Sequence, residues 1–107
     1  MFARRVTMHL KPNSVAEFTQ CLENDILALL RKQKGFQDEI TFVGQGGKEA
    51  FGISFWDTAE NAEAYNRETY TEVTKILATV VVEGTPQVET YEVANSTFHK
   101  IAVAVAA

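Results

Sequence analysis

The stretch Phe51–Tyr65, FGISFWDTAENAEAY, decides the fold of the second half of the chain. Its first residues alternate between apolar and small or polar side chains, which predicts a β-strand. Asp57 and Thr58 follow as candidate N-caps, so a helix is expected to begin directly after the strand. Trp56, the single tryptophan, stands at the junction and on the opposite strand face from Phe55.

Working toward the N-terminus, residues 2–10 alternate in the same way and predict a first strand. Ser14 with Glu17 three residues later has the spacing of a capping box. Apolar residues then recur at helical spacing as far as residue 30, and Gly35 suits the position after a helix end. The first half therefore predicts a strand followed by an amphipathic helix.

The rest of the chain supplies three more predicted strands. Residues 36–42 and 50–55 flank the glycine-rich segment 44–47, which predicts a hairpin. The second helix is expected to run to about residue 80 and to kink or split at the polar stretch 66–69, before Gly84-Thr85-Pro86 ends it. Residues 88–94 predict a fourth strand.

The predicted order is β-α-β-β-α-β in a single domain, residues 1–107. This is an α+β, ferredoxin-like split β-α-β arrangement, with both helices on one face of an antiparallel sheet. We place Gly52, Ser54, Trp56, Val88 and Thr90 on the uncovered face, which is too mixed to be fully solvated. A homodimer would cover that face. Residues 98–107 are then interpreted as an extension strand that reaches the partner subunit.

Composition excludes several function classes. The net charge of −4 and pI near 5.1 argue against a nucleic-acid partner, which requires a basic face. No apolar run is long enough for a membrane span, and no leader is recognised, so a cytoplasmic protein is expected. His9, His99 and Cys21 show no metal-ligand spacing, so no metal site is predicted.

Three features together resemble the dimeric α+β barrel superfamily, in particular the antibiotic-biosynthesis-monooxygenase-like domains. They are the first strand running into the helix at Ser14, the pair Phe55-Trp56 followed by DTAENAEAY, and the strand Pro86–Val93 with its Tyr91. The resemblance implies a homodimer whose sheets face each other, with the helices outside. It also implies a small apolar pocket between sheet and helices.

Members of this superfamily differ in chemistry. The haem-degrading members use an Asn on the first strand and a Trp and a later His on the second helix. Here the first strand has no Asn, Tyr65 stands near the position of that Trp, and Lys75 near that of the His, so haem is disfavoured. The members that oxidise aromatic substrates with O₂ use no cofactor, and none is expected here.

The predicted site lies on the second helix. Asn61 and Tyr65 are spaced i, i+4 and share a helix face, where they could orient a phenolic substrate and stabilise its oxyanion. Tyr70 or His9 is the candidate for the transferred proton. The expected pocket wall is Phe55, Trp56 and Val73. The alternative interpretation makes these aromatic residues core, Asn61 surface and His9 a surface or interface residue.

Two functions remain open at this point. The first is a homodimer that binds a small aromatic or apolar molecule and oxygenates it without a cofactor. The second is a non-catalytic ligand-binding or structural homodimer of the same fold, because fold alone does not determine function.

Overall fold

The computed structural model describes residues 1–80 and 82–101. The elements in chain order are β1 (Phe2–Leu10), α1 (Val15–Cys21), the π-helical turn η1 (Leu22–Ile26), α2 (Leu27–Arg31), β2 (Phe36–Val43), β3 (Glu49–Trp56), α3 (Ala59–Glu68), α4 (Tyr70–Val80) and β4 (Val82–Glu92).

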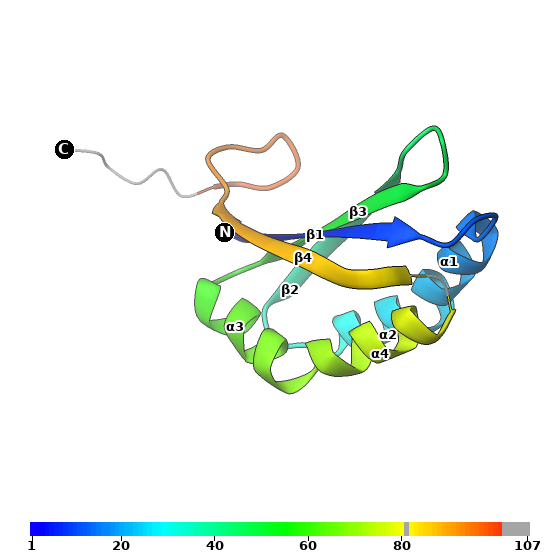
Figure 1. The fold of residues 1–107 in the computed structure, drawn as a ribbon. Helices are drawn as coiled ribbons and strands as arrows, with labels where there is room; N and C mark the ends of the chain where they lie inside the picture. Colours follow the sequence, from blue (N-terminus) through cyan, green and yellow to red (C-terminus); the bar gives the residue numbers. More distant parts are fainter. Residues whose placement is uncertain (81, 102–107) are drawn as a thin grey trace.

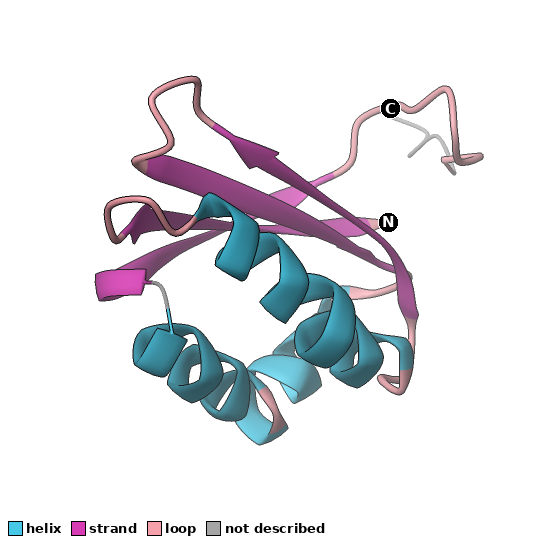
Figure 2. Ribbon diagram, turned by 90° about the vertical axis from the view of Figure 1, so that its right-hand side faces the viewer, coloured by secondary structure: helices cyan, strands magenta, loops and turns pink. Residues whose placement is uncertain are grey.

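The four strands form one antiparallel sheet in the order β2-β3-β1-β4. All the helices lie on one side of this sheet (Figures 1 and 2). The strand order and the one-sided helical layer confirm the predicted α+β, ferredoxin-like arrangement.

The first helical segment differs from the prediction in two details. The Ser14 hydroxyl donates to the Lys11 carbonyl at 2.5 Å and does not cap the helix, so the predicted capping box is wrong. The helix is also interrupted by η1, a π-turn that changes the helical register by one residue. Its apolar stripe still faces the sheet, with Phe18, Ile26 and Leu30 buried.

The second helical segment splits where the polar stretch predicted a break. α3 ends at Glu68 and α4 begins at Tyr70. Thr69 lies between them, and its hydroxyl is 3.2 Å from the side-chain oxygen of Gln33 in the first helical layer. At the start of α3, Thr58 rather than Asp57 caps the helix, accepting a hydrogen bond from the Asn61 backbone N–H.

The C-terminal region departs furthest from the prediction. β4 begins at Val82, so Gly84-Thr85-Pro86 does not end the helix but lies at an irregularity inside the strand. Residues 93–101 form a loop on the sheet side away from the helices (Figure 1), so no strand begins at residue 98. The rest of the predicted extension, 102–107, lies outside the described residues.

The prediction of which sheet face is uncovered is wrong. Gly52, Ser54 and Trp56 face the helices, and Trp56 is fully buried. Val88 and Thr90 also lie on the helix side, since they pair with Val6 and Arg4. Alternation shows which residues share a face but not which face the helices cover. Gly52 and Ser54 are small, which leaves room on this side of β3 for the side chains of the helices.

The open face carries the larger apolar side chains. Phe51, Ile53 and Phe55 of β3 lie there, beside two exposed residues of β2, Ile40 and Phe42. Phe42 and Phe51 stack with ring centroids 4.9 Å apart. An exposed apolar face of this kind is typical of an interaction surface.

Candidate functional site

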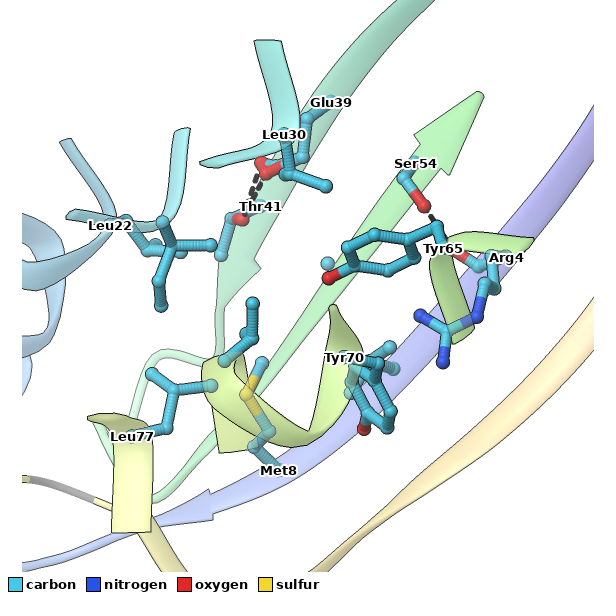
Figure 3. Close-up of a pocket in the computed structure, with 14 residues that line it drawn as sticks. Arg4, Met8, Leu22, Leu30, Glu39, Thr41, Ser54, Tyr65, Tyr70 and Leu77 are labelled. Atoms are coloured by element: carbon cyan, nitrogen blue, oxygen red, sulfur yellow. Dashed lines mark hydrogen bonds between the residues drawn. The ribbon is translucent and has the colours of Figure 1, made fainter. Parts of the chain in front are cut away.

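A cavity lies between the sheet and the helices (Figure 3). Its floor is made by strands β1, β2 and β3, and its roof by η1, α2, α3 and α4. The walls are mostly apolar, with Met8, Ile26, Leu30, Val73 and Leu77 among them. The cavity volume that the centre of a water molecule can reach is about 50 Å³. One water needs roughly 10–15 Å³ on this measure, so the cavity has room for more than one water molecule.

A row of three polar side chains crosses the floor. Glu39 of β2 pairs with Ser54 of β3, which in turn pairs with Arg4 of β1. In the next row Gly52 pairs with Thr41 and with Val6. Gly52 contributes no side chain there, and a Cβ at this position would lie 3.2 Å from the Thr41 hydroxyl. The missing side chain therefore helps to keep the floor open.

Arg4 is the most unusual residue of the site, since its side chain is charged and only 3% exposed. Its Nη2 donates to Asn66 Oδ1 at 2.7 Å, and its guanidinium lies 4.1 Å from the centre of the Tyr70 ring and 5.2 Å from that of Tyr65. A buried ion loses several kcal/mol of hydration, whereas cation–π contacts return about 2 kcal/mol when desolvated. Burial accordingly lowers the pKa of Arg4.

Tyr65 of α3 lies in the roof of the cavity, close to the guanidinium of Arg4. Its ring is buried, and Figure 3 shows its hydroxyl turned toward the middle of the cavity. Desolvation raises the pKa of Tyr65 to about 12, although the nearby Arg4 lowers it in part. The hydroxyl therefore stays protonated at neutral pH, where it can donate a hydrogen bond but cannot act as a phenolate base.

Tyr70 lies beside Tyr65, with ring centroids 6.1 Å apart, at the first residue of α4. Its hydroxyl is buried and makes no hydrogen bond of good geometry with a described residue. Desolvation raises the pKa of Tyr70, and the guanidinium of Arg4 lowers it in part. The hydrogen bond from Arg4 also lowers the pKa of Tyr70. Since this contact is not a hydrogen bond of good geometry, the buried hydroxyl keeps hydrogen-bonding capacity for a bound molecule.

Glu39 is the acidic group of the site and stands at the other end of the floor. Its carboxylate accepts hydrogen bonds from the Thr41 hydroxyl at 2.7 and 2.8 Å. Desolvation raises the pKa of Glu39, and the Thr41 bond lowers it in part. Two strand spacings, about 9–10 Å, separate its backbone from that of Arg4. The two charges thus lie at opposite ends of the floor.

The structure brings three of the predicted site residues together, because Tyr65, Tyr70 and Val73 all line the cavity. Asn61 does not line it. Its Nδ2 donates to Asp57 Oδ1 at 2.8 Å, at the start of α3. Trp56 lies outside the lining as well, since its ring is buried against Tyr65 and its Nε1 donates to Ser54 Oγ at 2.9 Å.

The remaining two predicted residues lie on the other side of the sheet. His9 is exposed and pairs along the backbone with Glu49 and Glu83. Phe55 lies beside His99, which contacts the carboxylate of Asp38. An open groove runs beneath the loop 93–99 there, but it is separated from the cavity by the sheet.

Sequence reasoning missed Arg4 and Glu39. The sequence pattern could have identified Arg4, because it shares a strand face with Val6, Met8 and Leu10. An arginine on a buried strand face is unusual and is therefore a candidate functional residue. Glu39 had no comparable signal, since it lies in a strand of mixed polarity.

Residues 1–80 and 82–101 hold neither a cluster of metal-binding side chains nor a helix suited to a membrane. No three His, Cys, Asp or Glu side chains within this part of the chain lie close enough together to hold a metal ion. None of its helices combines the length and the apolar character that a membrane crossing requires.

At the level of sequence, no protein-family model and no curated protein matches the chain. Solved structures do match. The protein NE2512 of unknown function from Nitrosomonas europaea has a TM-score of 0.73 at 16% identity, covering 96% of this chain and 95% of that one. SnoaB, a cofactor-independent oxygenase from Streptomyces nogalater, has a TM-score of 0.72 at 11% identity, covering 90% and 95%.

A third match carries a ligand. The monooxygenase from the ActVA-Orf6 gene of Streptomyces coelicolor, in complex with nanaomycin D, has a TM-score of 0.72 at 15% identity and covers 92% of each chain. Identities this low show the fold alone. The chain has the subunit fold of the antibiotic-biosynthesis-monooxygenase-like domains, and the resemblance found in the sequence is confirmed at that level.

Proposed function

We propose that this protein binds a small electron-rich aromatic molecule in the cavity between sheet and helices and oxygenates it with O₂, without a cofactor. The observation that carries the proposal is the convergence of the Tyr65 and Tyr70 side chains on a cavity whose walls are mostly apolar. An apolar cavity with a few directed polar groups is the usual form of a small-molecule site. The monooxygenases among the fold neighbours support the reaction type.

The proposed reaction draws its electrons from the substrate. A hydroquinone and O₂ would give a hydroxyquinone and water, so that one oxygen atom enters the ring and the other leaves as water. The deprotonated substrate carries the negative charge that starts the reaction. The protonated Tyr65 hydroxyl would donate a hydrogen bond to that oxyanion, which preorganised donors stabilise strongly in a dry site.

The size of the cavity limits the substrate. Its volume of about 50 Å³ is smaller than the roughly 150 Å³ of an engineered cavity that holds benzene. A ring can therefore enter only if a side chain moves. Tyr70 is the best candidate, since it is half-buried, begins a helix and has a hydroxyl without a hydrogen bond of good geometry. Substrates with one ring are favoured over fused systems such as anthrones.

We also propose that the active form is a homodimer in the cytoplasm. The exposed apolar residues of β2, together with Phe51, Ile53 and Phe55 of β3, form a surface that a second copy would cover. The lone, buried Cys21 suits a reducing compartment.

The alternative is a dimer that binds a ligand or serves a structural role without catalysis. The small volume of the cavity favours this alternative, because a filled interior would leave no place for substrate and oxygen. A catalytic assay separates the two directly.

The assay measures O₂ uptake with single-ring hydroquinones and with anthrones, against the spontaneous rate. We expect acceleration for the single-ring substrates and a loss of about 100-fold in kcat for Tyr65→Phe, the cost typical of removing one oxyanion donor. Tyr91→Phe, on the exposed β4 strand, is the matched control and should keep full activity. No acceleration by the wild-type protein would favour the non-catalytic dimer, and acceleration that is equal in Tyr65→Phe would contradict the role of the Tyr65 hydroxyl.

A further inference from the structure

We propose that the ligand of this cavity is an aromatic carboxylic acid, whose carboxylate pairs with the buried guanidinium of Arg4 while its ring occupies the apolar space beneath Tyr65. The inference rests on the proposed function and narrows its substrate class from aromatic molecules in general to single-ring acids.

The first argument is the unbalanced charge. Arg4 is almost completely buried, and in the part of the chain that the structure describes no carboxylate lies within ion-pair distance of its guanidinium. Glu63 lines the groove on the outer side of Arg4 but forms no ion pair with it. Asn66, which does bond to Arg4, is neutral. Buried charges in proteins are normally paired, so this buried guanidinium is suited to bind an anion.

The second argument is the geometry around the guanidinium. The Tyr70 ring lies against it at 4.1 Å, and Asn66 accepts from Nη2. A guanidinium has five N–H donors in a planar fork. Asn66 and the Tyr70 hydroxyl engage part of this fork, and its other N–H groups remain for a ligand. A planar carboxylate is the anion that a guanidinium binds in a bidentate way.

The third argument is the contrast between the two ends of the floor. Glu39 stands at the far end and would repel a second anionic group there, whereas Arg4 attracts one. Met8, Val73 and Leu77 provide apolar surface for the ring. The site therefore favours a molecule with one acidic end and an apolar or weakly polar body.

Binding of benzoate is compared with that of benzamide, its uncharged analogue, by isothermal titration calorimetry on the full-length protein. We expect benzoate to bind about 10- to 100-fold more tightly, the range that hydrogen bonds to charged groups supply. Arg4→Met should remove this preference. Arg5→Met, whose side chain lies over Phe51 on the opposite face, is the matched control and should keep it.

A second variant protects the test against misfolding of Arg4→Met. Asn66 is exposed, and Asn66→Asp would place a carboxylate 2.7 Å from Arg4 Nη2 without disturbing the core. We expect Asn66→Asp to bind benzoate about tenfold more weakly and benzamide as the wild-type protein does. Equal affinities of the wild-type protein for the two probes, or unchanged benzoate affinity in Asn66→Asp, would overturn the proposal.

Its failure is distinguishable from failure of the proposed function. Oxygenation of neutral hydroquinone without any preference for benzoate over benzamide would support the oxygenase function and contradict the proposal of an acidic ligand. Tight, Arg4-dependent benzoate binding without O₂ uptake on 2,5-dihydroxybenzoate would support the acidic ligand and contradict the oxygenase function.

Discussion

At the scale of single residues, Asn61 shows how a side chain of suitable chemistry can serve structure instead of the site. It shares a helix with Tyr65, but its amide is engaged with Asp57 at the helix start. Gly35 packs directly against this pair and has a φ of +82°, and its carbonyl accepts from the Asp57 backbone N–H at 2.9 Å. The contacts among these three residues hold the end of the first helical segment against the start of α3.

Gly35→Ala should therefore be strongly destabilising. A Cβ would lie 2.2 Å from Asp57 Oδ1 and 2.5 Å from Asn61 Nδ2, and the positive φ adds backbone strain. We expect a loss of at least 1–2 kcal/mol in the free energy of unfolding, from the left-handed backbone alone. Urea denaturation measures it. Gly46→Ala, with no atom within 4 Å of its Cβ, is the control and should change stability little; a similar midpoint for both variants would contradict the packing described.

At the scale of elements, the start of α3 has a pH-dependent stability. The hydrogen bond from Asn61 is the main cause that lowers the pKa of Asp57 in the folded protein. A lowered folded-state pKa gives stability that is present above the unfolded-state pKa and is lost as the pH falls through the folded-state pKa. This stabilisation should be reduced in Asn61→Ala, where the hydrogen bonds from Thr58 and the charge of Lys34 still act on Asp57.

We expect Asn61→Ala to lower Tm more at pH 7 than at pH 3, while kcat per folded molecule stays unchanged. Thermal unfolding at the two pH values and the O₂ assay measure both effects. A loss of Tm that is equal at the two pH values would contradict the role of the carboxylate, and a large fall in kcat would return Asn61 to the catalytic site.

The elements themselves were largely predictable from the sequence. Strand alternation and helical spacing located each element as far as Glu92, and the polar stretch 66–69 marked the break between α3 and α4. The π-turn and the early start of β4 were not predictable, because both depend on how the chain packs against neighbouring layers. The uncovered sheet face was predicted wrongly for the same reason.

The site was predictable only in part. Helical spacing placed Tyr65 and Val73 on one side of α3 and α4, and both line the cavity. It also grouped Asn61 with them, because spacing cannot show that a side chain bonds within its own turn. Arg4 and Glu39 come from two strands that join β3 on opposite sides, so only the sheet register brings them to the same floor.

At the scale of the whole molecule, the open face of the sheet is the surface on which the proposed dimer depends. Phe42 is 46% exposed and stacks on Phe51 on this face. Phe42→Asp would place a charge in a dimer interface, where it loses water without gaining a partner. We expect the wild-type protein to sediment as a dimer and Phe42→Asp as a monomer at micromolar concentration.

The control for this prediction is Glu68→Lys, a charge change on the helical side. It should leave the dimer intact. A wild-type protein that sediments as a monomer would contradict the dimer, and a dimeric Phe42→Asp would place the interface elsewhere.

The central claim is that chemistry takes place in the cavity between the sheet and the helices, and filling the cavity tests it most directly. Gly52→Val places a branched side chain on its floor, in a strand where valine is well suited. Gly46→Val, in the exposed hairpin, is the matched control. O₂ uptake with a single-ring hydroquinone is measured for both, after circular dichroism has shown that both are folded. We predict that Gly52→Val loses the acceleration and Gly46→Val keeps it; full activity in folded Gly52→Val would contradict the claim.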